Sequence, residues 1–522
     1  MVELDYFHLF WGVLISYVGV VLVLKVVVHL WWTPRRIENH FMKQGIRGPK
    51  YEFFLGNLKE LATLNLTASA QSMAPSHNIL PRVLSFYHHW KKIYGSMFLV
   101  WFGPTARLTV SDPALIREIF LVKQDMFEKN ESPLLVRKIE GDGLLSLKGE
   151  KWAHHRKVIQ PTFHTENLKL MIPMMAKSVE EAVAEWSEEM AAAGKVEIEV
   201  SEWFQNLVGD VITRVTFGSS SYAEGKAIFD LQSEQMAHAT EAYQKVFIPG
   251  YRFLPTRKNR ISWRLEKEIR KSLLKLIDGR RRRNSGCQVS DECPKDLLEV
   301  MIRAAAGDEA AAATAITAKD VVEECKTIFF AGKHTTANLL TWTTVLLAMH
   351  PQWQEQAREE VLRVCGARDT PTKDDLAKLK TLGMTLNETL RLYPPAVAII
   401  RRAKMDMQLG GLHILRGTEL LIPILAVHHD PALWCNDVHD FNPARFAKGV
   451  PLAAKHPMAF MPFGLGARRC IGQNLAVLQA RLALAIILQR FSFELAPAYQ
   501  HAPSVLMLLH PQHGAPVVFR KL

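Results

Sequence analysis

A lone cysteine, Cys470, lies near the C-terminus in a glycine-rich segment that reads PFGLGARRCIG over residues 462–472. A cysteine thiolate is a strong iron ligand, and backbone N–H groups aimed at its sulfur temper it. The segment supplies two glycines that allow close backbone approach, an aromatic shield and a cation: Gly466, Gly472, Phe463 and Arg468. The alternative is that Cys470 is only a small buried hydrophobic residue, which is a common role of a free cysteine.

Three further groups of residues have the types and spacing for chemistry. An apolar stretch carries FFAGKHTT over residues 329–336, in which His334 is a candidate for titration near neutral pH. For His334 we favour a histidine that only hydrogen-bonds within its helix. Trp152 and Arg156 are four residues apart, and Glu388 and Arg391 are three apart, so a helix would place each pair on one face.

A mainly helical fold with small β-sheets is expected to position these residues. Apolar residues recur at helical spacing over residues 166–190, 202–217, 264–278, 319–350, 352–364, 377–393 and 472–490. Aromatic and β-branched residues on either side of a Gly-Pro turn predict a hairpin over residues 94–111. We interpret the polar stretch 279–295 and the alanine-rich stretch 304–318 as surface connections, and we see no second domain.

The N-terminus predicts a membrane anchor. Its apolar run is long enough to cross a hydrocarbon core of about 30 Å, and Trp31 and Trp32 mark one interface. Basic residues follow the run while Glu3 and Asp5 precede it, so the positive-inside rule places the remainder of the chain in the cytosol. The predicted order is a lumenal tail (1–5), a transmembrane anchor (6–32), a basic Gly/Pro hinge (33–50) and a catalytic domain (51–522).

Composition narrows the class of protein. With 522 residues, 48% hydrophobic and 22% charged, the chain can bury a large core, which excludes a disordered protein. The net charge of +12 favours an acidic partner such as an anionic lipid surface or an acidic protein. We interpret the arginines at 280–283 as a solvated helix end, so no nucleic-acid partner is predicted.

Together these segments resemble the cytochromes P450. The resemblance implies a P450 fold with an N-terminal transmembrane helix, with Cys470 as the axial ligand of the iron of haem b. It assigns the other cofactor contacts to Trp152, Arg156, Arg401, Phe463, Arg468 and Gly472, with Arg402 as a rival of Arg401. A buried network that supports the haem-binding core is implied for Glu388, Arg391 and Arg445.

The resemblance also assigns catalytic roles in the FFAGKHTT segment. Gly332 would leave room for dioxygen, and Thr335 would hydrogen-bond it and relay protons through water. His334 departs from the family pattern, because many relatives carry Asp or Glu at this position. Proton delivery in this chain is therefore expected to differ from the common route.

Beyond these motifs, the chain is similar to the plant subfamily that inactivates brassinosteroid hormones. The stretches that carry this similarity are residues 41–49, 77–89, 247–253 and 500–509. The implied reaction is hydroxylation at C-26 of the side chain of brassinolide or castasterone. The implied substrate contacts are mostly apolar, with core packing as the alternative for each: Phe127, Leu144, Leu145, Phe329, Phe330, Ala331, Ala396, Val397, Ala398, Ile399, Leu506 and Met507.

Electrons must come from another protein, because the chain has no flavin or nicotinamide fingerprint. The resemblance implies NADPH–cytochrome P450 reductase as the partner. It also implies a single-pass protein of the endoplasmic reticulum membrane with a cytosolic catalytic domain. A basic surface for the acidic flavin domain is expected from Lys148, Lys151, Lys157, Lys448 and Arg469.

Three alternatives remain at the level of sequence. One is the same chemistry on a fatty acid or a terpenoid. Another is a haem-thiolate isomerase or dehydratase that needs no reductase. The third is a haem-binding sensor without catalysis, which the presence of Gly332 and Thr335 disfavours.

Overall fold

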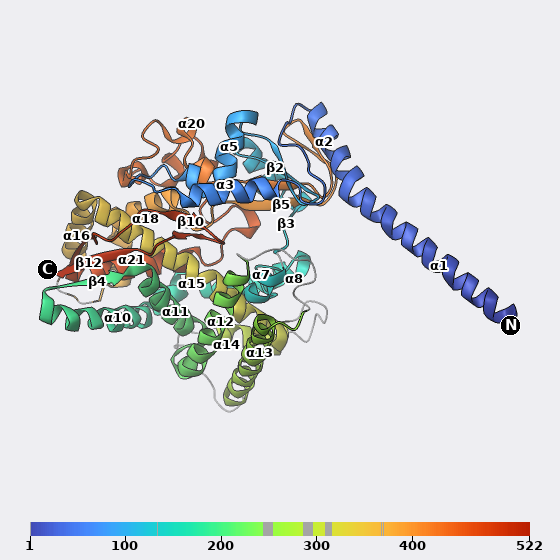
Figure 1. The fold of residues 1–522 in the computed structure, drawn as a ribbon. Helices are drawn as coiled ribbons and strands as arrows, with labels where there is room; N and C mark the ends of the chain where they lie inside the picture. Colours follow the sequence, from blue (N-terminus) through green and yellow to red (C-terminus); the bar gives the residue numbers. More distant parts are fainter. Residues whose placement is uncertain are drawn as a thin grey trace. The chain divides into compact units, whose positions relative to one another are not determined.

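The structure is a computed structural model that describes residues 2–132, 134–243, 254–284, 296–307, 316–366, 368 and 370–522. Its internal contacts divide the chain into two compact units. Unit 1 comprises residues 1–72, 78–130 and 398–427, and unit 2 comprises residues 73–77, 131–397 and 428–522. Helices predominate and the sheets are small (Figure 1), which confirms the expected fold class. The family-like stretch at 247–253 lies outside the described residues.

The N-terminal helix of unit 1 continues beyond the expected anchor. α1 (Val2–Val27), η1 (Val28–Trp32) and α2 (Thr33–Lys43) follow one another directly (Figure 1). Much of the expected hinge is therefore helical, and Pro34 follows directly after the π-helical turn η1, a local adjustment of the kind that accommodates proline within a helix. The chain turns at Gly45, with φ +81°. The helical stretch is long and apolar enough to cross a membrane, and none of its most apolar window is buried.

The hairpin predicted over residues 94–111 is present in unit 1. β1 (Leu99–Phe102) and β2 (Thr105–Thr109) pair antiparallel, and Gly103 makes the turn with φ +57°. The sheet has the order β1-β2-β8-β5-β3, in which β2 and β8 are parallel. The other strands of unit 1 are β3 (Phe127–Lys129), β5 (Ile399–Ala403), β6 (Met407–Leu409), β7 (Leu412–Ile414) and β8 (Glu419–Ile422). Its further helices are α3 (Leu58–Ala70), α4 (Leu80–Val83), α5 (Ser85–Tyr94), α6 (Pro113–Arg117), η2 (Glu118–Val122) and η3 (Gln124–Met126).

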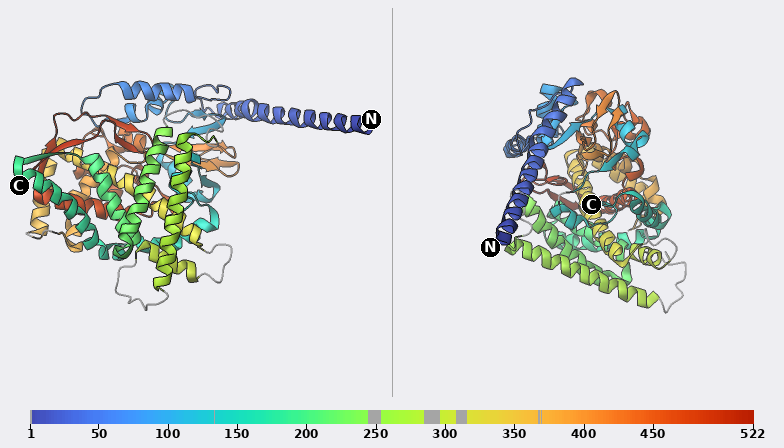
Figure 2. Two further views of the ribbon diagram at one scale, coloured as in Figure 1. Left: turned by 60° about the horizontal axis from the view of Figure 1, so that its bottom comes forward. Right: turned by 90° about the vertical axis from the view of Figure 1, so that its right-hand side faces the viewer.

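Unit 2 holds most of the helices. They include α7 (Leu134–Glu140), α8 (Gly149–Ile159), α9 (Thr165–Leu170), α10 (Ile172–Ala193), α11 (Val200–Phe217), α12 (Tyr222–Tyr243), α13 (Arg257–Asn284), α14 (Leu297–Gly307), α15 (Ala318–Met349), α16 (Pro351–Cys365), α17 (Lys373–Lys378), α18 (Lys380–Leu392), α20 (Pro431–Trp434) and α21 (Gln473–Arg490). α19 (Ile424–His428) ends at the boundary with unit 1. α12 and α13 lie side by side (Figure 2). Its strands pair as β4-β12-β9 and β10-β11, namely β4 (Lys195–Glu199), β9 (Phe491–Leu495), β10 (Pro503–Val505), β11 (Leu509–Pro511) and β12 (Pro516–Lys521).

Several predicted boundaries were wrong, for local reasons. The helix expected over 166–190 is α9 followed by α10, because Pro173 cannot continue the hydrogen-bond pattern of the preceding helix. The helix expected over 377–393 divides at Leu379 into α17 and α18. The stretches expected to be connections are partly helical, since α13 continues to Asn284 and α14 to Gly307. Their remainders, residues 285–295 and 308–315, lie outside the described residues.

The first arginine of the run at 280–283 is not solvated. Arg280 is buried, and its Nη1 donates to a carboxylate oxygen of Asp296 at 2.9 Å. Its Nη2 donates to the carbonyl of Phe217 at 2.9 Å. Arg282 is exposed, so the interpretation as a solvated helix end holds for that part of the run.

The long helix α15 forms the centre of unit 2. Its residues are buried on either side of a short window, residues 330–335, in which every residue is half-buried. A run of six consecutive residues covers all sides of a helix. Accessible surface in the middle of a buried helix is what residues show when they border internal space, so this window is a candidate wall of a site.

Candidate active site

The Cys470 segment is a tight loop at the start of α21. Gly464 and Gly466 turn the chain with φ of +70° and +69°, conformations that favour glycine. The backbone N–H of Cys470 donates to the carbonyl of Phe463 at 2.9 Å, which closes the loop. Gly472 is the N-cap residue of α21. The cysteine side chain is exposed, unlike those of Cys325 and Cys365, which are buried.

Opposing influences act on the Cys470 thiol. The surrounding protein raises its pKa by desolvation, while a backbone hydrogen bond from Gly472 and the charges of Arg156 and Arg469 lower it. The lowering influences stabilise the thiolate, which is the form that binds metal ions. A cationic metal at the sulfur would shift the balance further in the same direction.

Two guanidiniums flank the indole ring of Trp152 on α8. Arg468 lies 4.3 Å and Arg156 lies 5.6 Å from the ring centroid. Arg468 also donates to the carbonyl of Leu147 at 2.8 Å. Within the described residues, neither arginine forms an ion pair with a carboxylate. Burial lowers the pKa of each guanidinium, and the charge of Arg156 lowers the pKa of Arg468 further.

This donor set fits a haem. Two half-buried cations without an anion are costly unless a ligand supplies one. The two carboxylates of a haem would compensate both guanidiniums, and the Trp152 indole N–H, which donates no hydrogen bond within the described chain, offers a third donor. The thiol of Cys470 would supply the iron ligand.

Arg401, the other predicted propionate contact, belongs to unit 1. It lies on β5, where its guanidinium is 4.8 Å from the ring centroid of Phe120 and donates to the carbonyl of Ile400 at 3.1 Å. Arg401 is half-buried, whereas its rival Arg402 is exposed. Of the two, Arg401 has the environment of a side chain held in place.

The α15 window contains the predicted oxygen-side residues. The Thr335 hydroxyl donates to the carbonyl of Ala331 at 2.6 Å. Burial, together with the charge of Lys333, lowers the pKa of His334 to about 4, which keeps the imidazole neutral near pH 7. A Cβ at Gly332 would lie 2.8 Å from Cδ1 of Ile212, so on that side this glycine permits close packing against α11.

The proposed substrate residues have different environments. Phe329 is buried and stacks on Phe229 with ring centroids 3.9 Å apart, an environment that favours the alternative of core packing. Val397 and, in unit 1, Phe127 are also buried. The half-buried candidates in unit 2 are Leu144, Leu145, Phe330, Ala331, Ala396, Leu506 and Met507, the last two in the β10–β11 turn. Ala398 and Ile399 are half-buried in unit 1.

Glu388, Arg391 and Arg445 do form one buried network. Nε and Nη2 of Arg391 donate to the two carboxylate oxygens of Glu388 at 2.8 and 2.7 Å, and both side chains are fully buried. Nε of Arg445 lies 3.5 Å from Glu388. Arg445 also donates to both carboxylate oxygens of Asp437, at 3.0 and 2.8 Å. Our sequence analysis missed Asp437, because no helical spacing connects it with the arginine.

A second set of contacts that the sequence analysis missed holds α8 against α15. His155 Nδ1 lies 2.7 Å from a carboxylate oxygen of the buried Glu324, whose other oxygen accepts from the Leu144 backbone N–H at 3.0 Å. Lys151 Nζ donates to Asp320 at 2.6 Å. These contacts position the helix that carries Trp152 and Arg156. The acidic N-terminal part of α15 was the available signal.

Comparison with known proteins matches these observations. The family model described as "Cytochrome P450" matches residues 79–516. The chain is 65% identical over 504 residues to "Cytochrome P450 734A1" of Arabidopsis thaliana, which covers 96% of this chain and 95% of the relative. It is 60% identical over 507 residues to "Cytochrome P450 734A6" of Oryza sativa subsp. japonica, covering 95% and 93%. It is 39% identical over 508 residues to "11-oxo-beta-amyrin 30-oxidase" of Glycyrrhiza uralensis, covering 96% and 95%.

Proposed function

The chain belongs to the cytochrome P450 family and is a monooxygenase, and on this premise we propose that it hydroxylates C-26 of brassinosteroids such as brassinolide and castasterone. This reaction would inactivate the hormone and control its level. The observation that carries the proposal is the similarity to the brassinosteroid-inactivating subfamily along nearly the whole chain. The apolar character of the half-buried candidate residues suits a rigid steroid and supports it.

The protein residues would bind and orient the haem. Haem held through Cys470 would supply the iron centre at which dioxygen is activated. Arg156, Arg468 and Trp152 would hold the propionates, and Arg401 would add a further contact. Phe463 would shield the sulfur, and the Gly472 N–H would temper its basicity. The buried network around Glu388 would support the haem-binding core.

Thr335 would take part in proton delivery at the side of the haem where dioxygen binds. Its hydroxyl donates to Ala331 and keeps its lone pairs available to accept a hydrogen bond from water. A neutral His334 would not serve as an acid near pH 7, and Lys333 donates to the Ser233 hydroxyl at 2.9 Å. We propose that water held by Thr335 supplies protons in this chain.

Electron supply from a redox partner follows from the family. NADPH–cytochrome P450 reductase is the proposed partner, and the endoplasmic reticulum membrane is the proposed location, with the N-terminal helix as the single-pass anchor. Of the expected basic contacts, Lys148 and Lys151 are paired with Glu131 and Asp320, at 2.9 and 2.6 Å. The exposed Lys157, Lys448 and Arg469 are therefore the better candidates for an acidic flavin domain.

The first experiment uses the purified full chain with haem. Reduction under carbon monoxide should give the red-shifted Soret band of a thiolate ligand. Cys470→Ser should abolish this band, whereas Cys435→Ser, at another exposed cysteine, should preserve it. If both variants keep the band, the assignment of Cys470 as the ligand is overturned.

The substrate is tested separately on the same preparation. Titration with brassinolide should give a saturable spectral shift, and turnover with reductase should give the C-26 alcohol. A thiolate band without shift or product would leave the enzyme class intact and refute the brassinosteroid. Turnover without reductase would favour the isomerase alternative.

One observation favours a second candidate substrate class. The name of the Glycyrrhiza relative states oxidation of 11-oxo-beta-amyrin at position 30, and that relative is 39% identical to this chain. A triterpenoid is therefore the second candidate. β-Amyrin derivatives should be titrated beside brassinolide, and a tighter, productive complex would reverse the order of the two candidates.

A further inference from the structure

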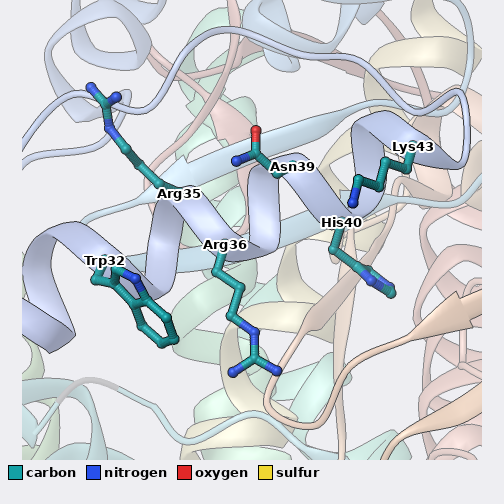
Figure 3. A pocket seen from close by; sticks show the side chains of 6 residues that line it. All are labelled: Trp32, Arg35, Arg36, Asn39, His40 and Lys43. Carbon is teal, nitrogen blue, oxygen red and sulfur yellow. The ribbon is translucent and has the colours of Figure 1, made fainter.

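A basic pocket lies on α2 in unit 1, just beyond the most apolar part of the anchor. Its volume is about 480 Å³. The lining side chains form two rows at four-residue spacing (Figure 3), namely Trp32, Arg36 and His40, and Arg35, Asn39 and Lys43. Arg36 extends to one side of the helix and Arg35 to the other (Figure 3). The two guanidiniums therefore point apart (Figure 3), and both side chains would have to turn toward a ligand that lies between the rows.

The cations of this pocket are held in place but are not neutralised. The guanidinium of Arg35 lies 4.1 Å from the ring centroid of Trp31, and that of Arg36 lies 5.5 Å from that of Trp32. Within the described residues, no carboxylate pairs with either arginine or with Lys43. Cation–π contacts leave the N–H edges of a guanidinium available to an anion. The pocket therefore offers uncompensated positive charge to a negatively charged ligand.

The pocket lies at the depth of lipid headgroups. From Phe10, about 20 residues at 1.5 Å each cross a hydrocarbon core of about 30 Å, so the helix leaves the core near Leu30. The headgroup layer then extends over roughly five further residues, to Arg35, and Arg36 follows directly at its outer edge. At the Leu30 carbonyl the helix accepts a hydrogen bond of 2.6 Å from Tyr51.

A second observation places the bilayer surface at the same level. Phe53, Phe54 and Leu55 are 56%, 48% and 45% exposed, an unusual concentration of apolar surface for a segment in water. The ring of Phe53 lies 6.0 Å from that of Trp31. Aromatic side chains of this kind concentrate at membrane interfaces.

We propose that the α2 pocket binds the headgroup of an anionic phospholipid. The phosphate would lie between the two rows and accept from Arg35 and Arg36, with Lys43 and the Asn39 amide at the outer end. An arginine presents a planar fork that matches phosphate oxygens. The lipid would hold unit 1 at a defined depth, which an apolar helix alone does not determine.

The test measures bound lipid on the full chain with haem. The detergent-purified protein is mixed with phosphatidic acid or with phosphatidylcholine of the same acyl chains, and native mass spectrometry counts the retained lipids. The variant Arg35→Gln/Arg36→Gln is compared with Arg47→Gln/Lys50→Gln, which removes the same charge from exposed residues outside the pocket. The haem spectrum reports whether each variant is folded.

We expect retention of phosphatidic acid by the unaltered chain, with a loss of about tenfold in the pocket variant. The control variant should remain within about twofold of the unaltered chain, because its charges lie outside the pocket. Equal losses in the two variants would mean that net charge alone attracts the lipid. Equal retention of the two lipids by the unaltered chain, or complete displacement of phosphatidic acid by inorganic phosphate, would also overturn the proposal. If the pocket variant lacks haem, Arg35→Lys/Arg36→Lys replaces it, and unchanged retention there would refute recognition by the guanidinium forks.

Discussion

Arg391 and Tyr393 are two residues apart, yet they anchor buried polar networks of different kinds in unit 2. All five N–H groups of Arg391 are used, on the carboxylate of Glu388 and on the carbonyls of His428, Val438 and Asp440. Tyr393 belongs to a chain of neutral groups. Its hydroxyl lies 2.9 Å from His77 Nδ1 and 3.2 Å from His501 Nε2.

The two networks depend on different properties. The ionic network is stable because each charge has a fixed partner, so its integrity depends on both partners being present. In the neutral chain His77 Nε2 lies 2.9 Å from His350 Nε2, so one ring must donate and the other accept. Protonation of both rings would place two cations in contact. The stability of the neutral chain therefore depends on pH, and that of the ionic network depends on the presence of both charged partners.

Removal of one ionic partner should have the largest effect. Arg391→Gln would leave the Glu388 carboxylate buried without its cation, which costs about 3–5 kcal/mol in the free energy of unfolding. Unfolding of the haem-loaded full chain in guanidinium chloride measures this free energy. Arg520→Gln, which removes an exposed ion pair with Glu494, should leave the free energy unchanged. Equal losses in the free energy of unfolding for Arg391→Gln and Arg520→Gln would show that burial of the network contributes nothing to stability.

Removal of the central hydroxyl should break the neutral chain at a smaller cost. Tyr393→Phe keeps the ring stacked on Trp342, with centroids 4.4 Å apart, but removes the contacts of its hydroxyl with His77 Nδ1 and His501 Nε2. The expected loss is about 1–3 kcal/mol in the same titration. Tyr499→Phe, at the outer end of the chain, should cost less because it removes a single contact with His501. The reverse order would contradict a network centred on Tyr393.

The two networks should differ in how steeply the free energy of unfolding changes with pH. Burial, followed by the charges of nearby histidines, lowers the pKa of His77 to about 3, below the ordinary value of 6.5. The unfolded chain therefore binds this proton more readily, and stability falls as pH decreases from about 6.5 toward 3, by about 1.4 kcal/mol per pH unit. His77→Asn should remove that part of the slope, whereas His89→Asn, at an exposed histidine, should not. An unchanged slope in His77→Asn would show that this imidazole is not kept neutral.

The smallest effect is expected at the outer edge of the ionic network. Asp437 binds both terminal nitrogens of Arg445, but its side chain is 40% exposed. Asp437→Asn keeps one carbonyl acceptor, and water replaces the other contact, so the loss should be below about 1 kcal/mol. Thermal unfolding of the holo chain measures it. A loss as large as that of Arg391→Gln would remove the distinction between the buried part and the edge of this network.

Local patterns were sufficient for much of the fold and part of the candidate site. Glu388 and Arg391 are three residues apart, and Gly464 and Gly466 of the Cys470 loop lie where the backbone has positive φ. The hairpin around Gly103 followed from a turn signal of two residues. In each case the interacting groups are within one turn or one hairpin, so spacing along the chain determines spacing in space.

The sequence was insufficient where neighbours in space decide the environment of a residue. The sequence does not distinguish Phe329 from Phe330, whereas the structure stacks the first on Phe229 and leaves the second half-buried. Gly332 was expected to leave open space, and on one side Ile212 occupies it. A side chain on a helix has no intrinsic preference for core or cavity, because the helices packed around it determine which side is filled.

The sequence by itself determined that this chain is a mainly helical P450 with a cysteine-containing loop and an N-terminal helix apolar enough to cross a membrane, because these features depend on composition and short-range spacing. Only the tertiary structure brought together His77, His350, Tyr393 and His501, which are up to 424 positions apart along the chain. The tertiary structure also paired Glu324 with His155 and left the pocket on α2 open. Such contacts arise when packing closes long loops, and no local propensity of the residues specifies their partners.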